Sequence, residues 1–186
     1  MTTLVPGPTI QVRTTLGRLV IEVYPDRAPL TTAAFLQFAG GLERSGTAFY
    51  RVVRQDNDKG DPPISVVQGG LTGDHDCPTV CHEPTSRTGI LHRDGAISLA
   101  RDAPGSASAA AFFICIGDQP SLDFGGRRNA DGQGFAAFGR VLAGMDVVRA
   151  IHRRPTSQDA PTAYLQGQML VRPVPLKLTL HVGPRR

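Results

Sequence analysis

The chain has 186 residues, of which 40% are hydrophobic and 19% charged, with 21 glycines, 15 prolines and a net charge of +4. This length is typical of one domain, and the many turn-forming residues favour a mostly β protein over a helical bundle. The first twenty residues lack a leader pattern, and no segment reaches the roughly 18 apolar residues of a membrane span. We therefore expect a cytoplasmic protein without a membrane segment, exported only if a leader has been removed from this sequence.

The basic residues are almost all arginines and are scattered along the chain. Pairs such as Arg127-Arg128 and Arg153-Arg154 are local concentrations of positive charge. No basic run alternates with aromatic residues, as it does in proteins that bind single-stranded nucleic acid. We therefore expect these arginines to lie on a solvated surface, and we expect no binding of nucleic acid.

Short apolar or alternating runs bounded by turn residues predict eight strands. In chain order they cover residues 10–12, 19–24, 49–53, 64–67, 96–100, 112–116, 138–142 and 176–182. Two helices are expected between them. The first covers Pro29–Ala39, in which apolar residues recur four positions apart before two glycines, and the second covers Met145–His152.

Three long segments between the strands lack any regular pattern. They cover residues 55–63, 69–88 and 120–134 and are rich in glycine, proline and polar residues. Long loops carried by a rigid sheet often form binding surfaces, so we expect these segments to frame a binding site. The elements together indicate a closed β-barrel with a helix at each end.

Four potential metal ligands lie close together in the second of these loops. They are His75, Cys77, Cys81 and His82, but their spacing is unusual for a structural zinc site. Loop thiols or a Cys77–Cys81 disulfide are the alternatives, and no metal site is predicted. Cys115 lies in an apolar run and is expected to be a small buried residue.

Five short segments match one known pattern in their order and spacing. They are 49–53 (FYRVV), 67–70 (VQGG), 112–115 (FFIC), 138–141 (FGRV) and 144–148 (GMDVV). Each is too short to be specific alone, but the ordered set, within about residues 10 to 182, resembles the cyclophilin family. The stretches 122–129 and 131–135 resemble a bacterial subgroup of that family.

The resemblance implies a mostly β fold, an eight-stranded antiparallel cyclophilin-like barrel capped by two α-helices. We expect one such domain over residues 1–186, with its core at about 10–182. The implied function is that of a peptidyl-prolyl cis/trans isomerase, which accelerates X-Pro isomerisation in protein folding without a cofactor. Its implied partners are proline-containing peptides and unfolded protein chains. The alternative is a proline-peptide-binding or chaperone-like module with weak or no turnover.

Matched segment by segment, the resemblance implies that Arg51 is the catalytic residue. The substrate-binding residues expected from it are Gln68, Val66, Ala100, Phe113, Leu122 and Phe135. Several of these are apolar and would form a pocket for the proline ring. Phe112 is expected to face away from Phe113, because side chains alternate along a strand.

The chemistry of the implied reaction explains why an arginine is sufficient. Rotation about a peptide bond has a barrier of about 18–20 kcal/mol, because the nitrogen lone pair is delocalised into the carbonyl. No bond breaks, and the twisted transition state localises that lone pair. A fixed guanidinium stabilises this state more than the planar ground state. Lysine is expected to substitute poorly, since it lacks the rigid donor fork of arginine.

The sequence departs from the common family pattern at four positions. Ala111 stands where a substrate-binding glutamine is common, and Ser121 where a tryptophan is common, so we expect weak cyclosporin binding. Ser65 replaces a phenylalanine that commonly lines the proline pocket, and Phe135 replaces a histidine. We expect Phe135 to cover the proline ring in compensation. The alternative is that its aromatic ring packs into the loop.

Overall fold

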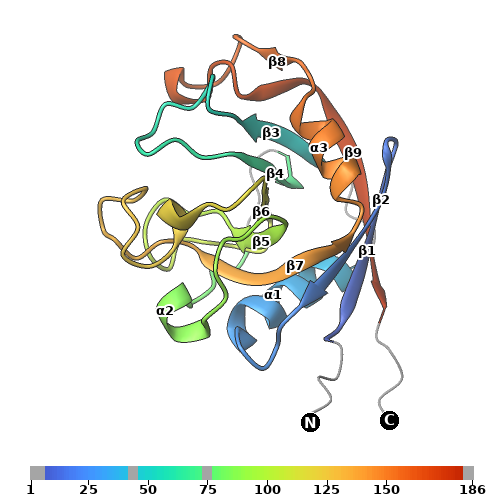
Figure 1. Ribbon diagram of the computed structural model, residues 1–186. Coiled ribbons are helices and arrows are strands. Elements are labelled where there is room, and N and C mark those ends of the chain that lie inside the picture. Colours follow the sequence, from blue (N-terminus) through green and yellow to red (C-terminus); the bar gives the residue numbers. More distant parts are fainter. Residues whose placement is uncertain (1–6, 42–45, 73–76, 182–186) are drawn as a thin grey trace.

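A closed antiparallel β-barrel forms the body of the computed structural model, which describes residues 7–41, 46–72 and 77–181 (Figure 1). Its eight strands are β1 (Thr9–Thr14), β2 (Gly17–Val23), β3 (Thr47–Val53), β4 (Val66–Leu71), β5 (Ala96–Leu99), β6 (Ala111–Cys115), β7 (Ala136–Ala143) and β9 (Met169–His181). They pair in the order β1-β2-β7-β5-β6-β4-β3-β9. The predicted eight-stranded antiparallel barrel is confirmed. The two-residue strand β8 (Thr156–Ser157) pairs with β9 outside this ring.

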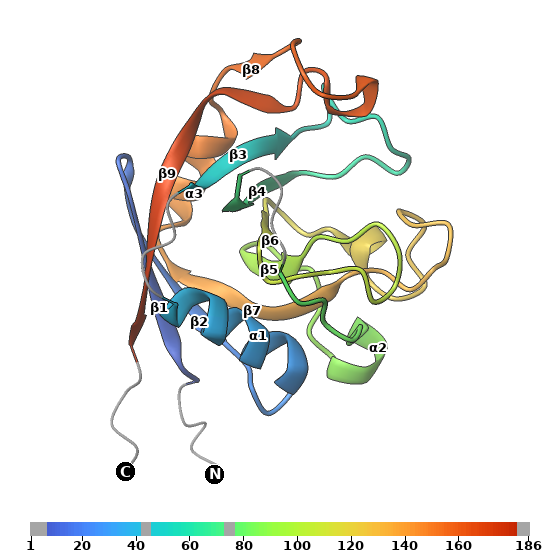
Figure 2. The same ribbon diagram turned by 180° about the vertical axis from the view of Figure 1, so that it is seen from behind.

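The ring closes between the first and the last of its strands. β1 and β9 run antiparallel from the pair Thr9 and His181 to the pair Thr14 and Leu176. Figure 2 shows β9 alongside β1 at one side of the barrel. Closure pairs the backbone groups of both strands and leaves no open sheet edge between them.

The last strand is longer than the sequence pattern indicates. We expected it over residues 176–182, but it begins at Met169, and residue 182 lies outside the described residues. Pro173 and Pro175 interrupt the expected pattern, because proline is rare inside paired strands. Pairing with β3 and β8 nevertheless extends the strand to Met169.

Helices α1 (Pro29–Gly40) and α3 (Met145–His152) are the two that the sequence predicts. Both views show them toward opposite ends of the barrel (Figures 1 and 2). A third helix, α2 (Thr85–Thr88), lies at the end of the segment expected to be irregular. One turn is too short to produce a helical repeat of apolar residues. The two-helix prediction is therefore incomplete by this element. Two short 3-10 helices, η1 (Pro120–Leu122) and η2 (Ala163–Leu165), follow later in the chain.

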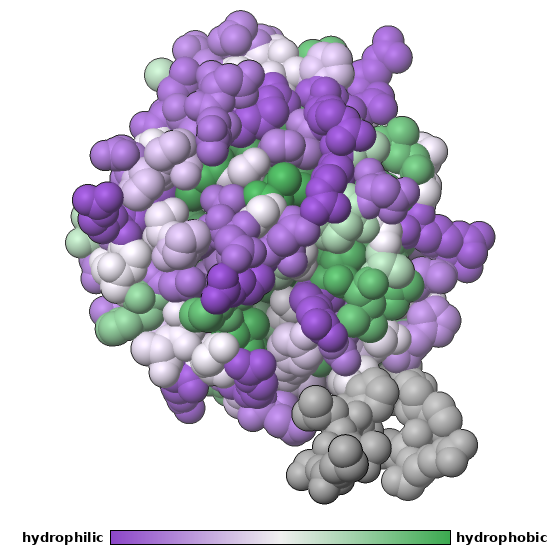
Figure 3. Space-filling view, in the orientation of Figure 1, coloured by the Kyte–Doolittle hydropathy of each residue, from purple (hydrophilic) through white to green (hydrophobic). Residues whose placement is uncertain are grey.

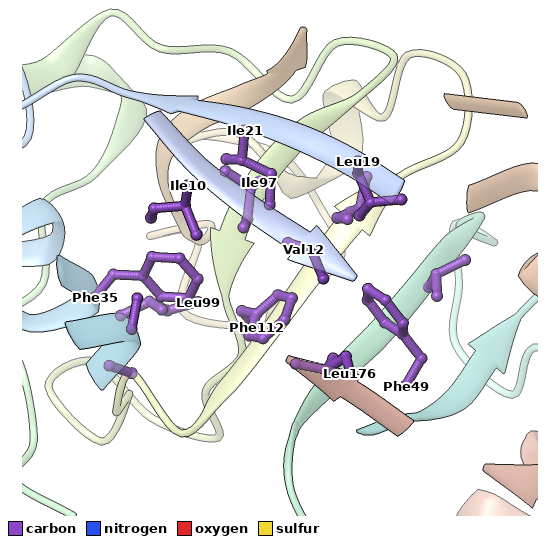
Figure 4. Close-up of a cluster of buried hydrophobic side chains, with 14 of the residues drawn as sticks. Ile10, Val12, Leu19, Ile21, Phe35, Phe49, Ile97, Leu99, Phe112 and Leu176 are labelled. Atoms are coloured by element: carbon purple, nitrogen blue, oxygen red, sulfur yellow. The ribbon is translucent and has the colours of Figure 1, made fainter. Parts of the chain in front are cut away.

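Apolar side chains fill the barrel, and a second, smaller cluster covers part of its outer face. Figure 4 shows Phe35 of α1, Phe112 of β6 and Phe49 of β3 following one another across the interior. Phe112 meets Phe35 edge-on at 5.3 Å and Phe49 at 6.0 Å between ring centroids. Phe113 belongs to the outer cluster, which confirms that neighbouring residues of β6 face opposite sides. The same outer cluster contains the fully buried Cys115, as expected.

The molecular surface is mostly hydrophilic on the face that Figure 3 shows, with hydrophobic side chains gathered in a few patches. Among the described residues, the large hydrophobic ones with more than a third of their surface exposed are Leu16, Leu30, Leu91, Phe124, Leu142, Tyr164 and Val171. Isolated exposed residues of this kind are normal for a folded domain. Within the described residues, no helix has the length and apolar character to cross a membrane.

A buried carboxylate caps the start of α1 from a distant loop. The N-cap residue, Ala28, makes no capping hydrogen bond through its own side chain. Instead, Glu83, which is 1% exposed, accepts hydrogen bonds from the backbone N–H of Leu30 at 3.3 Å and of Thr31 at 2.8 Å. The Thr31 hydroxyl also donates to it, at 2.7 Å. The negative charge suits the positive end of the helix dipole, so this contact ties the loop to α1.

A buried ion pair joins two of the long loops. Arg128 donates from Nη1 and Nη2 to the carboxylate of Asp58, each at 2.7 Å, and the side chains are 6% and 0% exposed. The backbone N–H groups of Gly60 and Ile64 donate to the same carboxylate. Burial alone raises the pKa of an aspartate, but these donors outweigh it and lower the pKa of Asp58. The expectation that Arg128 lies on a solvated surface is therefore wrong.

We predict that Glu83→Ala lowers the free energy of unfolding by about 1–3 kcal/mol, because it leaves the buried Thr31 N–H without an acceptor. Urea denaturation measures this change. Asp146→Ala is the matched control, since Asp146 is an exposed acidic residue in the first turn of α3. Its effect is expected to stay within about 0.5 kcal/mol. An unchanged unfolding midpoint for Glu83→Ala contradicts the capping role.

We predict that Asp58→Ala lowers the free energy of unfolding at neutral pH by about 3–5 kcal/mol, because it leaves the buried Arg128 unpaired. A lowered native pKa means that Asp58 stabilises the fold above its unfolded-state pKa and loses this effect as the pH falls. The difference in the free energy of unfolding between wild type and variant should therefore shrink as the pH falls from about 5 to about 2. Urea titrations across this range, with the exposed Asp56→Ala as control, test this. A constant difference contradicts it.

Candidate active site

A pocket of about 140 Å³ lies on the outer face of the barrel, over β3, β4 and β6. All seven residues that the sequence analysis singled out line it, namely Arg51, Val66, Gln68, Ala100, Phe113, Leu122 and Phe135. Pockets that enclose drug-sized ligands hold roughly 300–1,000 Å³. This smaller pocket suits a single small ring.

A β-bulge in β3 turns Arg51 toward this pocket. Phe49 and Arg51 are two residues apart and would share one face of a regular strand. The pairing of β3 with β4 and with β9 shifts between these two residues, so Tyr50 is inserted without a paired partner in either register. Phe49 and Val52 consequently remain in the barrel core, while Arg51 lies on the outer face. Bulges frequently redirect side chains in this way beside functional sites.

Two side-chain amides hold the guanidinium of Arg51. Its Nη1 donates to Oε1 of Gln68 at 2.9 Å, and Gln68 Nε2 donates to the hydroxyl of Tyr50 at 3.2 Å. Burial raises the pKa of Tyr50, which keeps this hydroxyl protonated at neutral pH. On its other edge, Arg51 donates from Nε and Nη2 to Oε1 of Gln168, at 2.9 and 2.6 Å.

The ring of Tyr164 packs against the same guanidinium. The ring centroid lies 5.4 Å from Cζ of Arg51, within the range of a cation–π contact. The Tyr164 hydroxyl accepts a hydrogen bond from Arg128 Nη2 at 3.1 Å. Arg128 also donates to the carbonyl of Pro62 at 2.9 Å. The buried ion pair of Arg128 thus holds one rim of the pocket.

The apolar side of the pocket includes the aromatic rings of Phe113 and Phe135 and the aliphatic side chains of Val66 and Leu122. Phe135 meets Phe113 edge-on, with 5.4 Å between ring centroids. Leu122 and Val66 are almost completely buried beside them. The ring of Phe135 is one of the side chains that line the pocket.

A second ion pair fixes Phe135 from the loop side. The guanidinium of Arg101 lies 5.3 Å from the Phe135 ring centroid, and its side chain is 1% exposed. Arg101 donates two hydrogen bonds of 2.9 Å to Asp131 and one of 2.7 Å to the carbonyl of Gly134. The hydrogen bonds from Arg101 lower the pKa of Asp131 to about 2, so this carboxylate stays charged at neutral pH.

A buried hydrogen-bond chain supports Phe113 from behind. The His92 ring stacks on Phe113, with 6.0 Å between centroids and 15° between planes. Its Nδ1 lies 2.7 Å from an Asp123 oxygen and its Nε2 lies 3.0 Å from the Ser98 hydroxyl. Ser98 is fully buried, so this chain orients the pocket wall and does not reach a substrate.

Ser65 and Ala111, the two small residues noted in the sequence, are not among the described residues that line the pocket. The Ser65 hydroxyl lies 3.1 Å from His152 Nε2, and its neighbour Ile64 lines the pocket instead. Burial lowers the pKa of His152, so its ring stays neutral at neutral pH. Ala111 lies at the start of β6 and is not among the described residues that line the pocket.

Cys77, Cys81 and His82, the described members of the cysteine and histidine group, do not line this pocket. Cys77 and Cys81 do not form the disulfide that was one alternative, and His75 lies outside the described residues. His82 Nε2 lies 3.0 Å from the carbonyl of Gln133. Within the part of the chain that the structure describes, no three potential metal ligands lie together.

Sequence reasoning missed several residues of the pocket. The further lining residues are Val53, Ile64, Arg101, Asp102, Arg128 and Tyr164. Val53 and Arg101 lie within two positions of predicted site residues along the chain, and this proximity was a usable signal. Arg128 comes from an irregular loop and Tyr164 from the three-residue helix η2, and neither segment is long enough or regular enough for a periodic pattern to indicate which way a side chain points.

Comparisons with known proteins agree with this geometry. The family description "Cyclophilin type peptidyl-prolyl cis-trans isomerase/CLD" matches residues 9–167. A peptidyl-prolyl cis-trans isomerase of Streptomyces antibioticus is 30% identical over 77% of this chain and 82% of its own length. Another, of Schizosaccharomyces pombe, is 30% identical over 82% of this chain and 90% of its own. Relatives thus come from fungi as well as bacteria and do not single out the bacterial subgroup.

Solved structures show the same fold. A cyclophilin type peptidyl-prolyl cis-trans isomerase of Cryptosporidium parvum superposes with a TM-score of 0.67 at 18% identity, covering 95% of this chain and 99% of that one. At this identity the likeness concerns the fold, which is the same closed barrel. Barrel, pocket and sequence matches together show that this chain belongs to the cyclophilin-type peptidyl-prolyl cis-trans isomerase family.

Proposed function

We propose that Arg51 is the residue of this isomerase that lowers the barrier to X-Pro rotation. The observation that carries the proposal is a fixed guanidinium at the edge of a small apolar pocket. Arginine has five N–H donors, and three of those of Arg51 are used within the described residues. Two donors therefore remain for a substrate.

The proposed reaction needs only orientation and electrostatics. The apolar pocket holds the prolyl ring, while the carbonyl that precedes it rotates in the open part of the site. The twisted peptide bond places a localised lone pair on the proline nitrogen. An Arg51 N–H directed at this nitrogen stabilises the twisted state more than the planar one. For every 1.4 kcal/mol or so by which the twisted state is stabilised more than the planar state, rotation is about tenfold faster.

The remaining proposed roles follow from the same arrangement. Substrate-binding residues in this proposal are Val66, Gln68, Ala100, Phe113, Leu122 and Phe135, all of which line the pocket. Because no bond is made or broken, the reaction requires no cofactor. The closure of the barrel between β1 and β9 supports one functional domain over about residues 10–182.

We further propose that the substrates are X-Pro segments of unfolded or flexible chains in the cytoplasm. A pocket of this size can take a prolyl ring, which an unfolded or flexible chain readily presents. The related Cryptosporidium protein was also solved in the presence of the dipeptide Ala-Pro. Nucleic acid is an unsuitable ligand here, since Arg101 and Arg128 in the pocket are each paired with a carboxylate.

Cyclosporin is proposed to bind weakly. Ser121 and Ala111 offer neither the large apolar surface nor the polar contact that tryptophan and glutamine supply at these positions in many family members. Ala111 is also the feature that favours the alternative, a module that binds proline peptides without useful turnover. The assay below separates the two functions.

We predict that Arg51→Ala lowers kcat/KM for an X-Pro peptide by about 100-fold or more, as expected for loss of a transition-state donor. Arg51→Lys should recover little of it, because an ammonium lacks the donor fork. A protease-coupled assay measures turnover, and Arg127→Ala, an exposed arginine, serves as control. Full turnover by Arg51→Ala overturns the proposal. Peptide binding without turnover by the wild type supports the binding module instead.

We predict that Phe135→Ala raises KM for the same peptide by about 3- to 10-fold with a smaller change in kcat, since an aromatic contact contributes about 0.5–1.5 kcal/mol. Phe124→Ala is the matched control, because Phe124 belongs to the same loop and is 47% exposed. An unchanged KM for Phe135→Ala means that this ring does not contact the prolyl group.

A further inference from the structure

Gln168 is a fully buried polar residue that contacts the proposed catalytic arginine. It immediately precedes β9 and is separated from Arg51 by 117 positions in the chain. Both ribbon views show the segment between β8 and β9 beside the loop that follows β3 (Figures 1 and 2). The amide therefore reaches Arg51 from a different part of the chain than Gln68.

The two amides contact opposite edges of the Arg51 guanidinium. Gln168 Oε1 accepts from both Nε and Nη2, whereas Gln68 Oε1 accepts from Nη1. Rotation about the last bonds of the arginine side chain would break at least one of these contacts. The pair of amides thus selects one orientation of the guanidinium and directs the two remaining N–H groups.

Three hydrogen bonds besides those to Arg51 fix Gln168. Its Nε2 donates to the carbonyl of Asn57 at 2.9 Å, so both polar atoms of the amide are satisfied. Its backbone carbonyl accepts from the N–H of Val52, and its backbone N–H donates to the carbonyl of Leu165. Asn57 in turn donates to the carbonyl of Gly167 at 2.8 Å. This anchoring leaves the side-chain amide a single orientation.

The amide also leaves the charge of Arg51 intact. Arg101 and Arg128 line the same pocket, and each is neutralised by a carboxylate at 2.7 to 2.9 Å. Arg51, by contrast, has no carboxylate within ion-pair distance among the described residues, and all its hydrogen bonds go to neutral amide oxygens. A carboxylate in the place of Gln168 would cancel much of the positive potential that Arg51 presents to a substrate.

We propose that Gln168 is a positioning residue for Arg51, which holds the guanidinium in its working orientation without neutralising its charge. The inference rests on the proposed catalytic role of Arg51 and adds a second determinant of that role. Gln168 acts through Arg51 and does not line the pocket itself.

Two substitutions separate orientation from charge. Gln168→Met removes the acceptor and keeps a side chain of similar length, so the guanidinium loses one of its two supports. Gln168→Glu keeps an acceptor but adds a negative charge. Gln166→Met is the matched control, since Gln166 lies two residues away and is exposed. Arg51→Ala is measured in the same assay.

We expect Gln168→Met to lower kcat by about 10- to 100-fold, the usual effect of a misplaced catalytic group. Peptide affinity, measured by titration, should change by less than about twofold, because the apolar pocket is untouched. Gln168→Glu should lower kcat by about tenfold through charge alone. The Nε–H signal of Arg51 in a nitrogen-15 NMR spectrum, identified by its loss in Arg51→Ala, should exchange faster with water in Gln168→Met and remain protected in Gln168→Glu.

Two results overturn the inference in distinguishable ways. The role of Gln168 alone is overturned if Gln168→Met keeps its full kcat while Arg51→Ala is inactive. An unchanged Nε–H exchange rate of Arg51 in Gln168→Met overturns it as well. Full activity of Arg51→Ala overturns the proposed role of Arg51 and the inference with it. If Gln168→Met does not fold, Gln168→Glu decides, since unchanged kcat in that variant contradicts the need for a neutral acceptor.

Discussion

The position of the site depends on one inserted residue in β3. The barrel interior is filled with side chains, so chemistry has to take place on the outer surface of the sheet. A regular strand would direct Arg51 to the same side as Phe49, and burying an unpaired guanidinium there would be very unfavourable. The bulge at Tyr50 removes this conflict. It keeps Phe49 and Val52 in the core, turns Arg51 outward, and brings the Tyr50 hydroxyl against Gln68.

The three arginines that line the pocket have two distinct roles. The pairs Arg101–Asp131 and Arg128–Asp58 are buried on their arginine side and join separate loops, so they give the rim its shape. They contribute little net charge to a substrate. The guanidinium of Arg51 is held by neutral amides and keeps its positive potential. The rim of this pocket is therefore formed in part by the Phe135 ring and two paired arginines.

Elements with a strong local pattern could be predicted from the sequence, and those that depend on distant contacts could not. The alternation of β6 correctly separated Phe112 from Phe113, and the seven predicted site residues meet at one pocket. The single turn of α2 is too short to show a helical repeat of apolar residues. Two prolines interrupt the strand pattern in the first half of β9, so that half was not predicted. Gln168 was missed because a glutamine in a turn normally faces solvent, and only the folded chain brings it to Arg51.

The closure of the barrel has a consequence for how the protein matures. β1 completes its pairing only with β9, the last strand among the described residues, and Gln168 immediately precedes that strand. Contacts between such distant segments form late and slow the search for the native state. Until β9 has left the ribosome, β1 of the nascent chain therefore has an unpaired edge. Arg51 also lacks its contact with the Gln168 amide during this time. Pairing of β9 with β1 and β3 closes the barrel and brings Gln168 to Arg51 in the same event.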